Sequence, residues 1–153
     1  MNRNKGFTIL EILLTLFILT LVVTIVIFLF SRLNSSKALD GSANLVVLTL
    51  DEARSLTLSS VGNSQYGVHF ADSEITLFKG SAYSSSDPSN IATELNSLVG
   101  LRNIILSGGG TDIVFTRLTG RTDEPGTLQV FLKNSSESFL TITVSSSGVV
   151  ESN

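Results

Sequence analysis

The sequence predicts an α+β protein in which one long N-terminal helix, transmembrane in its first half, packs on a small antiparallel β-sheet domain. Three observations support this fold class. Residues 7–30 form an apolar run, residues 31–62 repeat apolar side chains at helical spacing, and residues 63–153 hold short alternating segments separated by turns. Helix and strands that occupy separate stretches of a chain are typical of the α+β class.

The apolar run extends from Phe7 to Phe30, and every residue in it is apolar or Thr except Glu11. Its 24 residues exceed the roughly 20 that a helix needs to cross the hydrocarbon core of a bilayer. Arg3 and Lys5 precede the run, so we expect the N-terminus to stay in the cytoplasm and the C-terminal domain to lie outside. A carboxylate within such a run is costly, which suggests a specific partner charge for Glu11.

The helix is expected to continue beyond the membrane, to about Val61, with a C-cap and turn at Gly62-Asn63. Such a helix would be roughly 80 Å long. Gly41 and the triplet at residues 34–36 weaken it locally. One stripe, spaced alternately four and three residues apart, is expected to pack on the folded domain: Leu39, Ala43, Val46, Leu50 and Ala53.

The remaining residues predict short strands at Gln65–Phe70, Ile75–Lys79, Leu101–Leu106, Ile113–Leu118, Leu128–Leu132 and Phe139–Val144, with Val149-Val150 ending the sheet. Alternation is clear in residues 127–132 and 140–144, which indicates sheets with one buried face. A Ser-rich loop is expected between Lys79 and Ile91.

Composition excludes several classes of function. The chain has no cysteine and a single histidine, His69, so thiol catalysis and zinc thiolate sites are excluded and a histidine-based metal site is not expected. No nucleotide-binding or metalloprotease motif is present, and we expect no enzyme, no cofactor and no metal. A net charge of −3 argues against nucleic acid as the main partner.

The segment Lys5-Gly6-Phe7-Thr8-Ile9-Leu10-Glu11 resembles the class III signal of type IV pilins and type II secretion pseudopilins. Members of that family carry a short basic leader that ends in Gly, is cut before a residue that is commonly Phe, and is followed by an apolar helix with Glu fifth in the mature chain. The leader here would be residues 1–6, and counting from Phe7 makes Glu11 the fifth residue.

Two plainer interpretations compete with this one. A secretory signal has an apolar core of about 7–15 residues and an A-x-A-like cleavage site, whereas this core is longer and residues 30–34 offer no such site. A plain membrane anchor fits the length, but it predicts neither Gly6 before the run nor Glu11 inside it.

The resemblance implies a pathway for the chain. A prepilin peptidase would cut after Gly6 and N-methylate Phe7, and Glu11 would attract the N-terminal amine of a neighbouring subunit. The chain would cross the inner membrane once and then join a filament. Its partners would be other pilin or pseudopilin subunits, together with an assembly ATPase and a platform protein.

Within the family the chain looks most like the minor GspH/FimT-type branch. The similarity rests on Leu50-Asp51-Glu52-Ala53-Arg54-Ser55 and on residues 142–150, where Val149 follows Gly148 in place of the Arg that members often carry. We therefore expect a minor structural subunit of a type IV pilus or of a type II secretion pseudopilus.

Two alternatives remain open. A competence pseudopilin could bind DNA through Arg102, Arg117, Arg121 and Lys133, although nearby acidic residues would partly cancel their charge. Alternatively, the chain could be an unprocessed, membrane-anchored domain that recognises an extracytoplasmic partner.

Overall fold

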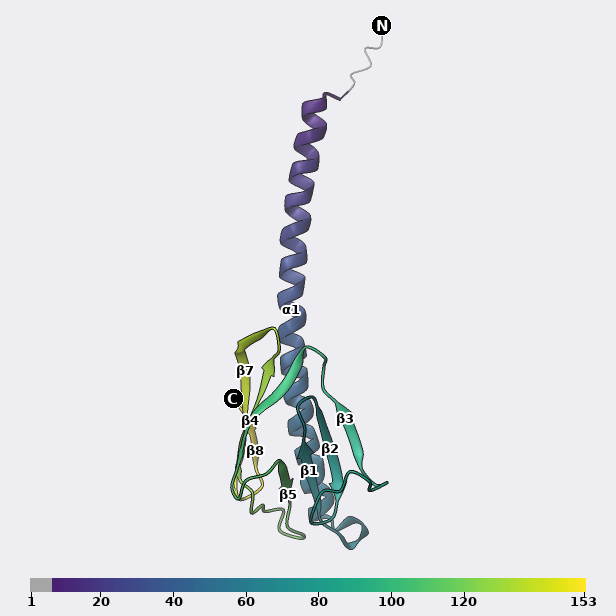
Figure 1. The fold of residues 1–153 in the computed structure, drawn as a ribbon, viewed down its shortest axis with the longest axis vertical. Coiled ribbons are helices and arrows are strands. Elements are labelled where there is room, and N and C mark those ends of the chain that lie inside the picture. The colour runs from purple at the N-terminus through teal and green to yellow at the C-terminus, as the bar shows by residue number, and fades with distance from the viewer. Residues whose placement is uncertain (1–6) are drawn as a thin grey trace. The chain divides into compact units, whose positions relative to one another are not determined.

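The computed structural model describes residues 7–153, apart from the side chains of Ser31 and Ser136. The chain divides into two units, residues 1–36 and residues 37–153. Helix α1 runs from Ile9 to Leu58 and contributes to both units (Figure 1). Gly41 and residues 34–36, which were expected to weaken this helix, are helical.

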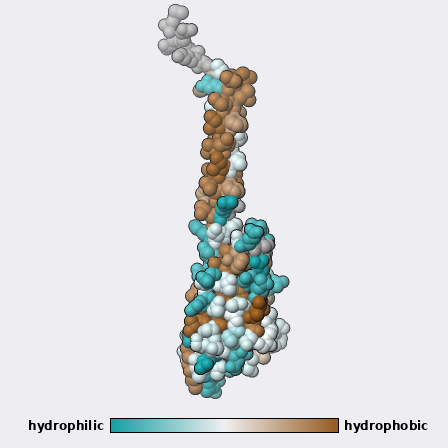
Figure 2. All heavy atoms as spheres, turned by 90° about the vertical axis from the view of Figure 1, so that its left-hand side faces the viewer, coloured by the Kyte–Doolittle hydropathy of each residue, from teal (hydrophilic) through white to brown (hydrophobic). Residues whose placement is uncertain are grey.

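In the first unit, α1 carries apolar side chains all round between Ile9 and Phe30, and they are exposed (Figure 2). These residues span about 33 Å at 1.5 Å per residue, close to the thickness of a hydrocarbon core of about 30 Å. The helix is long and apolar enough to cross a membrane, with a mean hydropathy of 3.2 in its most apolar window.

Threonine hydroxyls in this apolar part bond back to the helix's own carbonyl groups. Thr15 donates to the carbonyl of Ile12 at 2.9 Å, and Thr20 donates to that of Phe17 at 2.8 Å. Thr24 donates to the carbonyl of Thr20 at 2.8 Å. Their polar groups are therefore satisfied without water, as a membrane interior requires.

In the second unit, α1 packs on the domain through the stripe that its periodicity predicts. Leu39, Ala43, Val46, Leu50 and Ala53 are all buried, so the predicted helix stripe is confirmed. Burying a side chain the size of Leu50 contributes about 1.5–3 kcal/mol.

The domain contains two four-stranded antiparallel sheets, which confirms the predicted antiparallel β-domain. The first, in the order β3-β2-β1-β5, consists of β1 (Tyr66–Phe70), β2 (Glu74–Lys79), β3 (Ile91–Glu94) and β5 (Asp112–Val114). The second, in the order β4-β6-β7-β8, consists of β4 (Val99–Leu106), β6 (Gly126–Leu132), β7 (Ser135–Val144) and β8 (Val150–Ser152).

Side chains from both sheets and from α1 form one hydrophobic core. Its large, fully buried members from the strands and the loop after β5 include Phe70, Ile75, Ile113, Phe115, Leu128 and Ile142. Since the chain has no cysteine, no disulfide supplements this core.

The structure differs from the sequence expectation at several places: β4 begins at Val99 rather than Leu101, β7 begins at Ser135 rather than Phe139, and α1, β5 and β3 differ as follows. Helix α1 ends at Leu58 rather than near Val61, because Ser60 adopts a left-handed conformation with φ 50°; Gly62, at φ 58°, lies in the short 3-10 helix η1 (Val61–Asn63). The strand expected at residues 113–118 ends at Val114. Strand β3 was not predicted: it is a mostly exposed edge strand of 4 residues with no apolar alternation.

Candidate functional site

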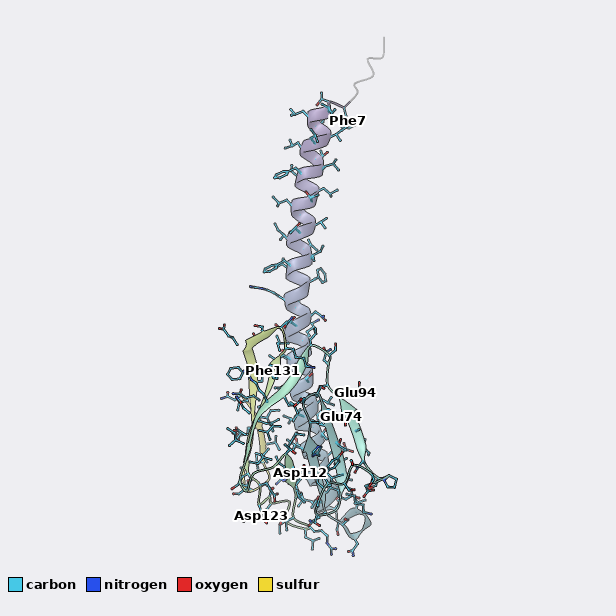
Figure 3. The ribbon with its side chains drawn as sticks, in the orientation of Figure 1. Phe7, Glu74, Glu94, Asp112, Asp123 and Phe131 are labelled. Atoms are coloured by element: carbon cyan, nitrogen blue, oxygen red, sulfur yellow. The ribbon has the colours of Figure 1, made fainter. Side chains whose placement is uncertain are left out.

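The helix start holds two of the three residues that the sequence singles out for processing and assembly. Phe7 and Thr8 lie outside α1, which begins at Ile9 (Figure 3). The Thr8 hydroxyl accepts a hydrogen bond from the amide of Glu11 at 3.2 Å, and its carbonyl accepts one from the amide of Ile12 at 3.2 Å. Thr8 is therefore the N-cap of α1.

Thr8 and Glu11 have the T-x-x-E spacing of a capping box, in which the N-cap and the third helical residue support each other. Sequence reasoning missed the role of Thr8, although this spacing was there to find it. The carboxylate of Glu11 also lies in the first turn, where the helix dipole favours a negative charge.

Glu11 forms no ion pair within residues 7–153. Its carboxylate is exposed, as is Phe7, whose exposed fraction is 78%. Gly6, the third residue of the predicted processing site, lies outside the described residues. The carboxylate of Glu11 is therefore exposed at the start of α1 and forms no ion pair with the described residues.

Of the basic residues considered for DNA contact, Arg102 is occupied by contacts on the second sheet. Its guanidinium carbon lies 4.7 Å from the ring centroid of Phe131 and 5.4 Å from that of Phe139. Its Nε donates to the side-chain oxygen of Gln129 at 3.2 Å. These contacts fix Arg102 by cation–π and hydrogen-bond interactions.

The other three basic residues lie at two further places. Arg117 and Arg121 share the loop between β5 and β6, where Arg117 donates to the carbonyl of Asn63 at 3.0 Å. Lys133 follows the end of β6, about 13 Å along that strand from Gln129, the partner of Arg102. The structure brings Arg117 and Arg121 together and leaves Arg102 and Lys133 elsewhere, so DNA contact stays a prediction.

The two segments that resemble the GspH/FimT branch meet at Arg54. Its Nε donates to the carbonyl of Gly120 at 3.2 Å, and its Nη2 donates to that of Ser147 at 3.4 Å. Gly148 has φ 78°, and a Cβ there would collide with the Gly120 carbonyl and lie 2.9 Å from the Nε of Arg54. Arg54 thus fixes the loops before β6 and before β8 on the last turns of α1.

His69 has a structural explanation. Its Nδ1 lies 2.5 Å from an Asp112 oxygen, and its ring stacks on that of Tyr83 with centroids 3.9 Å apart. This contact holds the loop of residues 80–90 on the first sheet. Within that loop, two hydrogen bonds from Ser89 lower the pKa of Asp87; the one from its hydroxyl has the larger effect, and the one from its amide adds to it.

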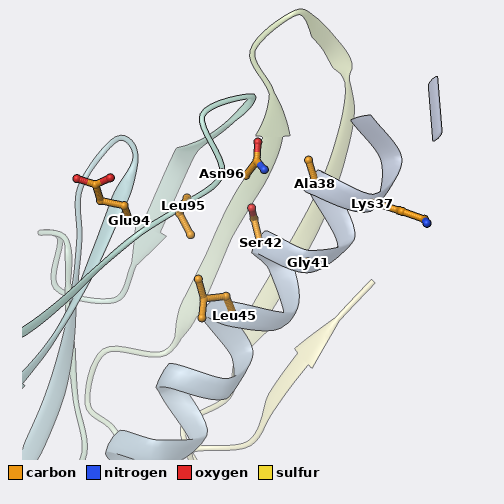
Figure 4. A pocket seen from close by; sticks show the side chains of 8 residues that line it. All are labelled: Lys37, Ala38, Gly41, Ser42, Leu45, Glu94, Leu95 and Asn96. Carbon is orange, nitrogen blue, oxygen red and sulfur yellow. The ribbon is translucent and has the colours of Figure 1, made fainter. Parts of the chain in front are cut away.

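A groove lies where α1 passes the segment between β3 and β4 (Figure 4). Its charged lining residues are Lys37 and Glu94, one of each sign, and Leu45 and Leu95 supply apolar surface. Among residues 7–153 no group of three His, Cys, Asp or Glu side chains is placed to hold a metal ion. The groove therefore points to no particular ligand.

Comparison with known proteins matches residues 1–27 to the prokaryotic N-terminal methylation motif. No curated protein matches the chain in sequence. The fold is similar to that of the type IV minor pilin FimU of Pseudomonas aeruginosa in two crystal forms. One match has a TM-score of 0.58 at 13% identity and covers 75% of this chain and 92% of FimU. The other has a TM-score of 0.60 at 13% identity and covers 81% and 92%.

The methylation motif and the similarity of the fold both point to pilin-like proteins. The motif covers residues 1–27, which include most of the apolar run, and the structural likeness extends over most of the chain. The chain therefore combines an N-terminal methylation motif with a fold similar to that of a type IV minor pilin.

Proposed function

We propose that this chain is a minor subunit of a type IV pilus or type II secretion pseudopilus, of the GspH/FimT type. The observation that carries the proposal is Glu11, an unpaired carboxylate in the first turn of an apolar helix, five residues beyond Gly6. The hydrogen bond from Arg54 to the carbonyl of Ser147, next to Gly148, supports the GspH/FimT resemblance, since both segments then take part in one contact.

In this proposal a prepilin peptidase cuts between Gly6 and Phe7 at the cytoplasmic face of the membrane and methylates the new amine. The cap at Thr8 keeps Phe7 out of the helix, which suits a protease that must bind its substrate in an extended conformation. The C-terminal domain lies on the outer side of the membrane, in keeping with Arg3 and Lys5 before the run.

Assembly would then bring the Phe7 amine of one subunit to the Glu11 carboxylate of its neighbour. Pairing offsets the desolvation of both charges as the helices leave lipid for a filament core, and removing one partner leaves the other buried alone, at about 3–5 kcal/mol. An assembly ATPase and a platform protein would supply the work.

The test is to co-express the full chain with an active prepilin peptidase and measure the mass and first residue of the product. We expect N-methyl-Phe7 for the wild type and an intact Met1 for Gly6→Leu. Glu11→Gln keeps the length of the side chain without its charge, and should be processed but fail to enter filaments. A wild-type chain that still starts at Met1 would refute the proposal.

A further inference from the structure

Leu118 combines a left-handed backbone conformation with an exposed apolar side chain. Its φ is 66°, and the other non-glycine residues with positive φ are Ser60, Asn63 and Asn103. Asn tolerates this left-handed conformation, whereas a large apolar residue rarely adopts it. Its side chain is also 65% exposed. Residues held in sparsely populated backbone conformations cluster at active sites, ligand clamps and switch regions.

The backbone around Leu118 is fixed rather than loose. Residues 116–121, the tip loop, close on themselves through hydrogen bonds from the Thr116 amide to the Arg121 carbonyl at 2.7 Å and from the Gly120 amide to the Thr116 carbonyl at 2.9 Å. Arg54 holds the carbonyl of Gly120 from α1. The tip loop is thus a rigid turn that displays Leu118 between Arg117 and Arg121.

A complementary surface lies on α1 of the same chain. Leu48 is 64% exposed, although its helical neighbours toward the domain are buried. Asp51 and Glu52, three and four residues later, lie on the same side of the helix and are exposed. Neither carboxylate forms an ion pair within residues 7–153. We call Leu48, Asp51 and Glu52 the acidic helix face.

We propose that the tip loop of one copy docks on the acidic helix face of a second copy, with Leu118 against Leu48 and the arginines against the carboxylates. This inference rests on the proposed function as a filament subunit. The contact joins two different surfaces, and such heterologous contacts build open helical assemblies when the rotation does not close. Charge complementarity selects the partner copy, since each face would repel its own kind.

The chain has no cysteine, so single cysteines report the contact directly. Two full-length variants, Leu48→Cys and Leu118→Cys, are given different tags and co-expressed with the peptidase. Membranes that contain both variants are then treated with an oxidant, so that neighbouring cysteines form a disulfide. Leu118 contacts the carbonyl of Thr57, about 13 Å along α1 from Leu48, so these positions cannot bridge within one chain. The matched control replaces Leu118→Cys with Ser97→Cys, an exposed residue in the turn between β3 and β4.

We expect a disulfide dimer that contains both tags, a several-fold weaker one with Arg121→Glu, and recovery when Arg121→Glu is combined with Asp51→Arg and Glu52→Arg. Three outcomes would overturn the inference. They are a Leu48→Cys homodimer in place of the mixed dimer, cross-linking of Ser97→Cys to Leu48→Cys as strong as that of Leu118→Cys, and no cross-linking at all. The N-terminal mass is read from the same membranes. Processed chains without the mixed dimer refute the contact alone, whereas unprocessed chains refute the proposed function.

Discussion

Replacing Gly148 with Ala should destabilise the second sheet at the end where Arg54 binds the loops before β6 and β8. Gly148 has φ 78°, where a side chain costs about 1–2 kcal/mol. The new methyl group would meet the backbone carbonyl of Gly120, which cannot rotate away as a side chain could, and would also lie 2.9 Å from the Nε of Arg54.

Relief of that collision requires the loops to separate, which breaks the hydrogen bonds from Arg54 to Gly120 and Ser147. Hydrogen bonds from a charged donor contribute about 1.5–3 kcal/mol each, and partial loss of both brings the expected cost to about 3–5 kcal/mol. This is a large part of the roughly 5–15 kcal/mol that stabilises a typical domain.

The assay is thermal unfolding of the full-length chain in detergent, followed by circular dichroism in the β-sheet region. We expect the Tm of Gly148→Ala to fall by about 10 °C or more. Gly41→Ala is the matched control, because a Cβ at Gly41 meets nothing within 4 Å and Ala favours the helix by about 1 kcal/mol. A Gly148→Ala chain that unfolds within 2 °C or so of wild type would refute the reasoning.

Further substitutions test other contacts. Leu50→Ala removes a fully buried side chain from α1 and should destabilise the domain by about 2–5 kcal/mol, measured by the same thermal assay. Thr8→Val removes the cap hydroxyl while keeping the shape; we expect slower peptidase cleavage than with Thr8→Ser, measured by the mass of the N-terminus over time. Tyr83→Ala should free the loop of residues 80–90 from His69, seen as faster proteolysis at that loop, and unchanged proteolysis would contradict the stacking role.

The parts of the fold that follow from periodic burial were predictable from sequence. Val46 and Leu50 recur at helical spacing because one side of α1 faces the core, and residues 127–132 alternate because one face of β6 does. Strand β3 could not be found this way, since it lies at an edge and buries no regular side. The left-handed residues Ser60 and Leu118 depend on tertiary contacts that no local pattern encodes.

The candidate site was predictable to a different degree at each end of α1. Glu11 stands out because it is the only charge in an apolar run, and Thr8 follows from the spacing of a capping box. The grouping of Arg117 with Arg121, apart from Arg102, depends on which strand each loop joins. The contact of Arg54 with Gly120 spans 66 residues of sequence, so neither residue alone indicates it.

The inward-bonded threonines of the apolar segment have a consequence for how such helices could align. The hydroxyls of Thr15, Thr20 and Thr24 donate hydrogen bonds to carbonyls of their own helix, so in this arrangement they donate none to a neighbouring helix. Apolar side chains on neighbouring helices gain dispersion contacts of only about 0.1–0.2 kcal/mol for each pair of atoms. Glu11 is the only charged residue within residues 9–30, so in a bundle of these helices a neighbour's charge paired with it would favour one axial stagger.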